Sequence, residues 1–323
     1  MNLGVPFGLS SGLCWGAADF FGGIQSRRLS ALTVAFWSQL AGALALAAAL
    51  AISAIRPSGP EVAWGLAAGV GSGCALVLFY RSLAEGTMSV AAPISACGAI
   101  VPVVAALLTG NQPGTLAALG VLTAITGVIL VSRPHPSPPT TPATPMVPAT
   151  PATPATGAAP GTVEPSGTPG GPGTPGRAGR VVAMALGSAL GFGLFYVFVD
   201  AGTAAAAGSG GSRSSPLWVI AGARMSSLAI LSTIALVSRR SALRWPGRRI
   251  GAVALIGIGD TGANLLFAYA ATTGNLAVVG VLGSLYPVAT VVLARWLLGE
   301  RLSGGQNAGV VLALTGVGLL AAA

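Results

Sequence analysis

Long apolar stretches, each followed by a short polar break, run along most of the 323-residue chain. About 20 consecutive apolar residues are what an α-helix needs to cross the hydrocarbon core of a bilayer. The pattern therefore predicts an all-α membrane protein with ten transmembrane helices. We expect them at about residues 5–24, 31–55, 62–83, 90–109, 115–131, 180–200, 216–237, 250–272, 276–298 and 309–323.

One segment in the middle of the chain has a different composition. Residues 133–179 hold fourteen of the 23 prolines, in tracts rich in proline, threonine and glycine. This proline density excludes a continuous helix, and the segment has almost no apolar side chains to bury. We therefore predict a disordered linker at 133–179 between two membrane regions, 1–132 and 180–323, of five helices each.

The overall composition supports a membrane protein over a soluble one. The chain is 53% hydrophobic and 7% charged, whereas a soluble domain carries about 25% charged residues. The formal charge of +9 comes from arginines that lie mostly in short loops and at helix ends. Such a distribution is typical of residues that orient a membrane protein, so we do not expect nucleic acid as a partner.

The chain lacks the residue patterns of an enzyme or a metal site. Its one histidine, His135, lies in the predicted linker, and its three cysteines lie singly within apolar stretches. No catalytic triad, zinc-ligand spacing or phosphate-binding loop can be assembled from these residues. We therefore expect no enzymatic activity, no metal and no cofactor.

The two membrane regions align with each other as one repeat that occurs twice. The alignment pairs Trp15 with Tyr196, Asp19 with Asp200, Gln39 with Arg224, Ser72 with Asp260, and 126–128 with 315–317. Because five is an odd number of crossings, the second repeat must insert with the opposite orientation to the first. Inverted repeats are a secondary-transporter architecture, in which the solute site lies between the repeats near mid-membrane.

The end of the chain resembles a known family. Tyr286-Pro287 precedes an apolar run, the tetrapeptide Gly299-Glu300-Arg301-Leu302 and a glycine-rich apolar stretch. This order resembles the end of an EamA-type repeat of the drug/metabolite transporter superfamily. The resemblance implies ten helices around a central cavity, alternating access, and efflux or exchange of small organic solutes. The first repeat departs from the pattern, because it has Gly110-Asn111-Gln112 in place of Gly-Glu-Arg.

Ionisable side chains inside the predicted spans are the first candidates for a site. Each costs roughly 2.5–3.5 kcal/mol at the bilayer centre, so it needs a partner or a function. Asp19 and Asp200 either titrate protons and bind a solute amine, or reach water from near their helix ends. Asp260, with Asn264 one turn later, either titrates or makes a structural hydrogen bond. Arg224 either binds an anionic solute group or pairs with an aspartate.

Other candidates are polar, aromatic or helix-breaking. Gln39 is opposite Arg224 in the repeat alignment, and Trp15 and Tyr196 either line a cavity or serve as packing residues. Kinks that shape the cavity are predicted in the fourth and ninth helices from Pro93, Pro102, Tyr286 and Pro287.

These features predict a secondary active transporter that moves a small organic metabolite, amino acid or drug-like solute, with export as the expected direction and protons as the candidate coupling ion. The alternative is a non-transporting membrane scaffold or sensor whose linker binds a partner. A scaffold has no need of embedded ionisable residues, so the transporter is favoured.

We expect a multi-pass protein of a bacterial cell membrane, because arginine entirely replaces lysine in a chain rich in alanine and glycine. The arginines cluster in the odd-numbered loops, which by the positive-inside rule places both termini outside. The family resemblance implies both termini inside.

Overall fold

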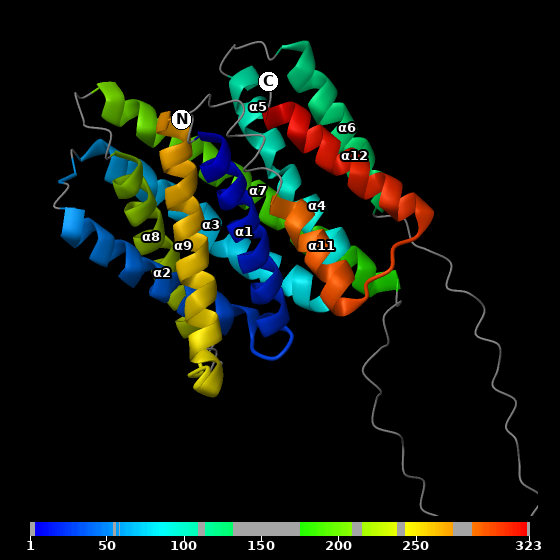
Figure 1. Cartoon of the computed structure of the whole chain (residues 1–323), viewed down its shortest axis with the longest axis horizontal. Coiled ribbons are helices and arrows are strands. Elements are labelled where there is room, and N and C mark those ends of the chain that lie inside the picture. The colour runs from blue at the N-terminus through cyan, green and yellow to red at the C-terminus, as the bar shows by residue number, and fades with distance from the viewer. Residues whose placement is uncertain are drawn as a thin grey trace, which may run out of the picture.

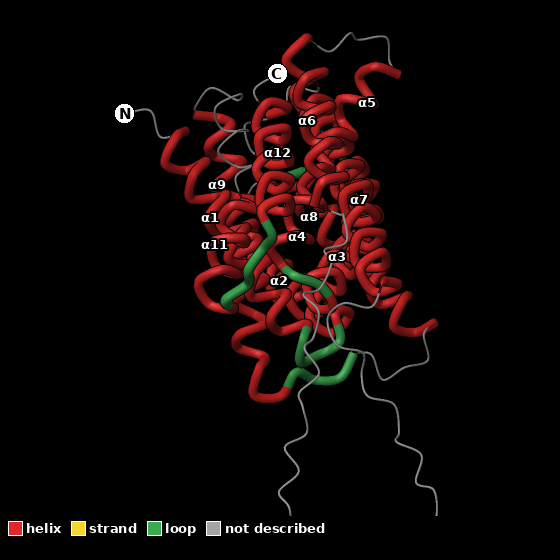
Figure 2. The backbone as a smooth tube through the Cα atoms, turned by 90° about the vertical axis from the view of Figure 1, so that its right-hand side faces the viewer, coloured by secondary structure: helices red, strands yellow, loops and turns green. Residues whose placement is uncertain are grey.

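The computed structural model shows a bundle of helices and describes residues 4–53, 56–57, 59–108, 114–131, 175–208, 215–237, 243–273 and 286–321. The first repeat contains α1 (Gly4–Ser26), α2 (Ala31–Ser53), α3 (Pro60–Glu85), α4 (Met88–Ala96), a 3-10 turn (Cys97–Ala99), α5 (Ile100–Leu108) and α6 (Thr115–Val131). The second contains α7 (Pro175–Gly208), α8 (Ser215–Val237), a 3-10 turn (Gly247–Arg249), α9 (Ile250–Thr273), α11 (Tyr286–Leu298) and α12 (Gly304–Ala321). Within these ranges there is no strand, and Figure 2 shows the helices side by side with loops at the ends of the bundle.

Several described helices are long and apolar enough to cross a membrane. There are five of them, at Ala31–Ser53, Pro60–Glu85, Gly176–Val199, Pro216–Val237 and Gly247–Phe267. Shorter apolar helices occur at Ala118–Leu130 and Tyr286–Leu298. The predicted all-α membrane class is thus confirmed, while the number of ten crossings stays a prediction.

The fourth predicted helix is interrupted in the structure. In place of one helix at 90–109, the chain forms α4, the 3-10 turn and α5. Pro102 has no N–H to donate to the carbonyl of Gly98, so the α-helical ladder cannot continue regularly through the turn. Gly98 also lies directly against α7, near the backbone of Ala189. Pro93, by contrast, lies within α4, which continues past it.

Pro287, which is predicted to kink the ninth helix, is the second residue of α11. The predicted helical segment before it, 276–285, lies outside the described residues, so the kink at Pro287 stays a prediction.

The first helix of the second repeat is longer than predicted at both ends. It starts at Pro175 in place of Arg180, and it ends at Gly208, past the expected end at 200. Proline is well tolerated at the first helical position. Contacts with the end of α3 hold the added turn, because Arg177 donates to the Glu85 carbonyl at 3.1 Å and Arg180 pairs with the Glu85 carboxylate at 2.8 Å. The rest of the predicted linker, 133–174, lies outside the described residues.

The helices of the two repeats pack in exchanged pairs. Helix α1 packs on α9 and α11, and α7 packs in the same way on α3 and α4. Helices α6 and α12 lie side by side (Figure 1). There, Gly127 of α6 lies against Ala313, and Gly316 of α12 lies against Ala124. Gly127 and Gly316 are aligned in the repeat. Ala124 lies three residues before Gly127, and Ala313 lies three residues before Gly316. The two contacts are therefore equivalent, as the repeat alignment predicts.

Helices α3 and α8 approach each other closely because one face of α3 has no side chains. Gly65, Gly69 and Gly73 recur every four residues on α3, and they face α8 at Val219, Ala223 and Ser227. A Cβ atom at Gly65 or Gly69 would overlap the α8 backbone. The glycine spacing therefore sets the distance between these helices. The main apolar core lies nearby and includes the buried side chains of Phe20, Phe79 and Leu231.

Charged side chains join the repeats at one end of the bundle. Glu300, in the loop between α11 and α12, accepts hydrogen bonds from the backbone N–H groups of Met88 and Ser89, each at 2.9 Å. It also pairs with Arg27 at 3.4 Å. Through its two bonds to backbone N–H groups, Glu300 caps the N-terminus of α4. The N-cap residue, Thr87, makes no side-chain capping bond of its own. Both chain termini lie toward the opposite end of the bundle (Figure 1).

Candidate functional site

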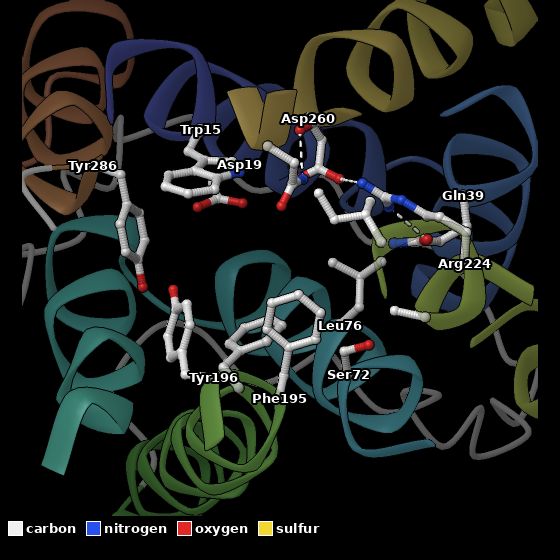
Figure 3. A pocket seen from close by; sticks show the side chains of 14 residues that line it. Trp15, Asp19, Gln39, Ser72, Leu76, Phe195, Tyr196, Arg224, Asp260 and Tyr286 are labelled. Atoms are coloured by element: carbon white, nitrogen blue, oxygen red, sulfur yellow. Dashed lines mark hydrogen bonds and ion pairs between the residues drawn. The ribbon is translucent and has the colours of Figure 1, made fainter. Parts of the chain in front are cut away.

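A cavity with a volume of about 110 Å³ lies between the two repeats. Helices α1, α2 and α3 of the first repeat and α7, α8, α9 and α11 of the second all contribute to its wall (Figure 3). The lining residues are Trp15, Asp19, Gln39, Ser72, Leu76, Phe192, Phe195, Tyr196, Ile220, Ala223, Arg224, Asp260, Asn264 and Tyr286.

The cavity brings together nearly all the residues proposed from the sequence to bind solute or protons. Seven of the eight line it: Trp15, Asp19, Gln39, Tyr196, Arg224, Asp260 and Asn264. The eighth, Asp200, belongs to α7, but its side chain lies outside the described residues. Polar side chains gather here because lipid cannot solvate them, so embedded polar groups face the interior of the bundle.

The wall is built from positions that are equivalent in the two repeats. Trp15 and Tyr196, Gln39 and Arg224, and Ser72 and Asp260 are aligned pairs, and both members of each pair line the cavity. The cavity therefore lies where the two repeats meet.

Arg224 is held by two partners. Only 7% of the residue is exposed. Its Nη1 donates to Oε1 of Gln39 at 2.5 Å, and its Nη2 donates to Oδ2 of Asp260. Arg224 thus pairs with an aspartate, Asp260, which is one of the two roles expected from the sequence. A carboxylate and an amide oxygen as acceptors largely offset the free-energy cost of removing the Arg224 guanidinium from water.

Asp260 is held from a second direction as well. Asn264, one turn later on α9, donates from Nδ2 to the Asp260 backbone carbonyl at 2.7 Å. The Asp260 side chain is 30% exposed, while that of Arg224 is 8% exposed. The pair thus presents its carboxylate edge, rather than its guanidinium, to the cavity.

Asp19 differs from Asp260 in having no partner. Its carboxylate points into the cavity beside Trp15 (Figure 3), and no other described residue hydrogen-bonds to it or pairs with it. When both aspartates are ionised, the lining side chains carry two negative charges and one positive charge. The described wall therefore has one uncompensated negative charge, at Asp19.

Aromatic rings form much of the remaining wall. Five of the fourteen lining residues are aromatic, in a chain that is 6% aromatic, so rings are concentrated at the cavity. The ring of Trp15 lies 5.5 Å from that of Phe267 and 6.4 Å from that of Tyr286, which meets it edge-on. Tyr286 and Tyr196 extend toward each other at one side of the cavity (Figure 3).

Sequence reasoning missed part of the wall. Leu76, Phe192 and Phe195 carry no mark that distinguishes them from other apolar helix residues. Ser72 did carry a signal, because it is aligned with Asp260. Tyr286 was predicted only as a helix-breaking residue, but its side chain lines the cavity. Pro93 and Pro287 are not among the lining residues.

The chemistry available in the cavity is binding by charge, hydrogen bonds and ring faces. No group of three or more histidine, cysteine, aspartate or glutamate side chains able to hold a metal ion occurs in the part of the chain that the structure describes.

Comparison with known proteins identifies a family for both halves of the chain. The EamA-like transporter family matches residues 2–133 and 179–322. A solved structure described only as a crystal structure of a protein is 17% identical and has a TM-score of 0.56, with 98% of this chain and 95% of that chain covered. At this identity the likeness concerns the fold alone. No curated protein matches the chain.

Proposed function

Because the chain belongs to the EamA-like transporter family, we propose that it is a secondary transporter that carries a small organic solute through the cavity between its repeats. The observation that carries this proposal is the described part of the cavity wall. There, one carboxylate without a described partner, that of Asp19, faces a space bounded by aromatic rings and a compensated ion pair. Such a wall binds a polar organic molecule while excluding the surrounding lipid.

The exchanged helix pairs support an alternating-access mechanism. Each of the pairs α1–α9 and α3–α7 joins a helix of one repeat to a helix of the other, and both pairs line the cavity. A small rotation of one pair against the other opens the cavity toward one side of the membrane and closes it toward the other. The proposal includes ten crossings in two inverted repeats, with the contact between α6 and α12 maintained through the cycle.

Asp19 is the group that we propose to exchange a proton during the cycle. It faces the cavity, and no described residue neutralises it. Asp260 is committed to Arg224, so it contributes a fixed charge. The proposed cycle exports solute across a bacterial cell membrane in exchange for protons; the direction rests on the family resemblance.

The alternative function is a membrane scaffold or sensor that does not transport. A scaffold needs close helix packing, which the glycine faces of α3, α6 and α12 supply. It does not need a polar cavity between its repeats, so the cavity favours transport.

Transport can be tested with purified protein in liposomes. We would impose a pH gradient, add amines, amino acids or organic acids, and follow the internal pH with a trapped dye. We expect proton flux that depends on at least one solute, retained in Glu85→Gln and lost in Asp19→Asn. Glu85 is a suitable control because it lies at the end of α3, is paired with Arg81 and Arg180, and is not among the residues that line the cavity. An absence of flux and of solute counterflow for every class would contradict the proposed function.

A further inference from the structure

The cavity distinguishes between classes of solute by charge. The geometry points to an organic monocation with an aromatic or apolar body as the transported solute, bound by the Asp19 carboxylate and the surrounding rings. This inference rests on the proposed function, because it names the solute of the same cavity.

The charges in the wall disfavour an anion. The described lining contains one cation, Arg224, whose guanidinium already donates to Gln39 and Asp260. An incoming carboxylate would have to share Arg224 with the Asp260 carboxylate, which already balances its charge. A second carboxylate beside one guanidinium is unfavourable because like charges repel. Asp19, in contrast, offers an unoccupied acceptor to a positive group.

A zwitterion is disfavoured for the same reason. Its ammonium group would find Asp19, but its carboxylate would enter a wall whose only described cation is occupied. A buried charge without a partner costs several kcal/mol, roughly what one good ion pair returns. A monocation avoids that cost, so it should bind more tightly than an amino acid with the same side chain.

The rings favour a cation for a second reason. A cation within about 6 Å of an aromatic face is attracted by the ring quadrupole, most strongly by tryptophan. Trp15 lies beside Asp19 (Figure 3), and Tyr196 and Phe195 face the same space from α7. A positive group at the Asp19 carboxylate is therefore placed next to ring faces that also attract it.

The remaining wall indicates an organic cation over a metal ion. Leu76, Ile220 and Ala223 contribute an apolar surface that binds carbon, whereas alkali and alkaline-earth ions require several oxygen ligands. The described lining has no cluster of acidic residues able to surround an ion.

Three probes with one common body test the inference on the unmodified protein. Phenethylammonium is the cation, phenylalanine is the zwitterion and 3-phenylpropionate is the anion. Binding is measured by isothermal titration to the full-length protein in lipid nanodiscs at neutral pH. We expect phenethylammonium to bind at least about tenfold more tightly than either other probe. Phenyltrimethylammonium, which has no N–H to donate, should also bind, because charge and ring faces are sufficient.

Variants then assign the binding to the named residues. Asp19→Asn should weaken phenethylammonium binding by about a hundredfold, and Glu85→Gln should leave it unchanged. Trp15→Leu should weaken it by about tenfold, while Trp15→Phe, which keeps a ring, should retain most of the affinity. Melting temperatures of the variants exclude simple misfolding.

The outcomes separate the solute class from transport itself. Equal or tighter binding of phenylalanine or phenylpropionate overturns the inference, and so does unchanged phenethylammonium affinity in a folded Asp19→Asn variant. A failure of all three probes, with solute-driven proton flux still present for another compound, also overturns the inference while the proposed function stands. Tight cation binding without any flux or counterflow supports the inference about the site and contradicts transport.

Discussion

Two aspartates in one cavity have different neighbours. Asp260 lies beside Arg224, which would otherwise be a buried charge with one amide partner. Asp19 lies beside rings and open space. We therefore propose that the first aspartate stabilises the fold and that the second is available to a solute or a proton. The repeat alignment pairs Asp19 with Asp200 and Asp260 with Ser72, so sequence equivalence alone does not reveal this division.

Removing the charge of Asp260 should destabilise the protein. Asp260→Asn leaves the Arg224 guanidinium buried with Gln39 as its remaining described acceptor, which should cost about 3 kcal/mol. We expect a clearly lower melting temperature in detergent, and recovery of most of the loss when Arg224→Gln is added. Asp19→Asn is the matched control; it removes no described partner, so its melting temperature should stay within a few degrees of the unmodified protein. Equal melting temperatures for the two single variants would contradict the different roles.

The composition of the site could largely be predicted from the sequence, because lipid excludes polar side chains and thus forces Asp19, Gln39, Arg224 and Asp260 inward. Their pairing could not be predicted. Whether Arg224 meets Asp260, Asp200 or a solute depends on how α8 and α9 are rotated against each other, and a single sequence carries no signal for that rotation.

At the scale of helices, glycines set the distances between elements. Gly69 of α3 lies so close to Ala223 of α8 that a Cβ atom would overlap the α8 backbone. The main chains must therefore separate if a side chain is added. Such a shift would also move Arg224, the next residue of α8, which lines the cavity.

Gly69→Ala should consequently be destabilising despite the better helix propensity of alanine. Overpacking at such a contact costs about 1–3 kcal/mol. Gly262→Ala on α9 is a suitable control, because a Cβ atom there meets nothing within 4 Å, and helix propensity alone should stabilise it by up to about 1 kcal/mol. Thermal unfolding of both variants measures the difference. A neutral or stabilising Gly69→Ala would show that α3 and α8 are farther apart than described.

The Gly-Glu-Arg segment, noted in the sequence only as a resemblance, has a physical role in the structure. The Glu300 carboxylate caps α4 and pairs with Arg27, so it connects the second repeat to two elements of the first. Glu300→Ala should lower stability by about 1–2 kcal/mol, and Glu300→Gln, which keeps one acceptor oxygen, by less. The order of melting temperatures, unmodified, then Gln, then Ala, checks the prediction. A melting temperature for Glu300→Ala equal to the unmodified protein would contradict the cap.

Helix positions were largely predictable from apolar stretches, and Pro102 indicated a break in the fourth helix, but the exact positions of helix interruptions and helix ends were not predictable. The break at Cys97–Ala99 depends on Pro102 together with the contact of Gly98 against α7. The extra turn at Pro175 depends on contacts of Arg177 and Arg180 with Glu85. The contacts that fix these positions come from helices distant in sequence, and a local pattern does not contain them.

At the scale of the whole molecule, the two halves exchange equivalent contacts, and the described termini lie toward the end of the bundle away from Glu300 (Figure 1). Inverted repeats of five crossings require the segment between the repeats and the C-terminus to lie on opposite sides of the membrane. By the positive-inside rule the arginine-rich end, which includes Arg27, Arg180 and Arg249, faces the cytoplasm, while the family resemblance implies the reverse. The proposed inverted arrangement is compatible with either orientation.

A pair of topology reporters tests the inverted arrangement. An alkaline phosphatase or fluorescent protein inserted within residues 133–174 and one fused after Ala323 should report opposite sides of the membrane. A third fusion before Met1 should agree with the one after Ala323. Reporters on the same side in the linker and at the C-terminus would mean an even number of crossings between them, and the inverted repeat would be wrong.

The central claim is that the cavity between the repeats opens alternately to the two sides of the membrane. Ser72 lines this cavity, whereas Leu122 on α6 is 63% exposed on the outside of the bundle, where lipid would cover it. We would place single cysteines at these positions after replacing Cys14, Cys74 and Cys97 by alanine. A membrane-impermeant thiol reagent would then be added to sealed vesicles of each orientation.

Labelling of the two cysteines gives the direct answer. We predict that Ser72→Cys is labelled from both sides of the membrane, that bound solute slows the labelling, and that Leu122→Cys is labelled from neither side. Labelling of Ser72→Cys from one side only, or from neither, with or without solute, would contradict alternating access through this cavity.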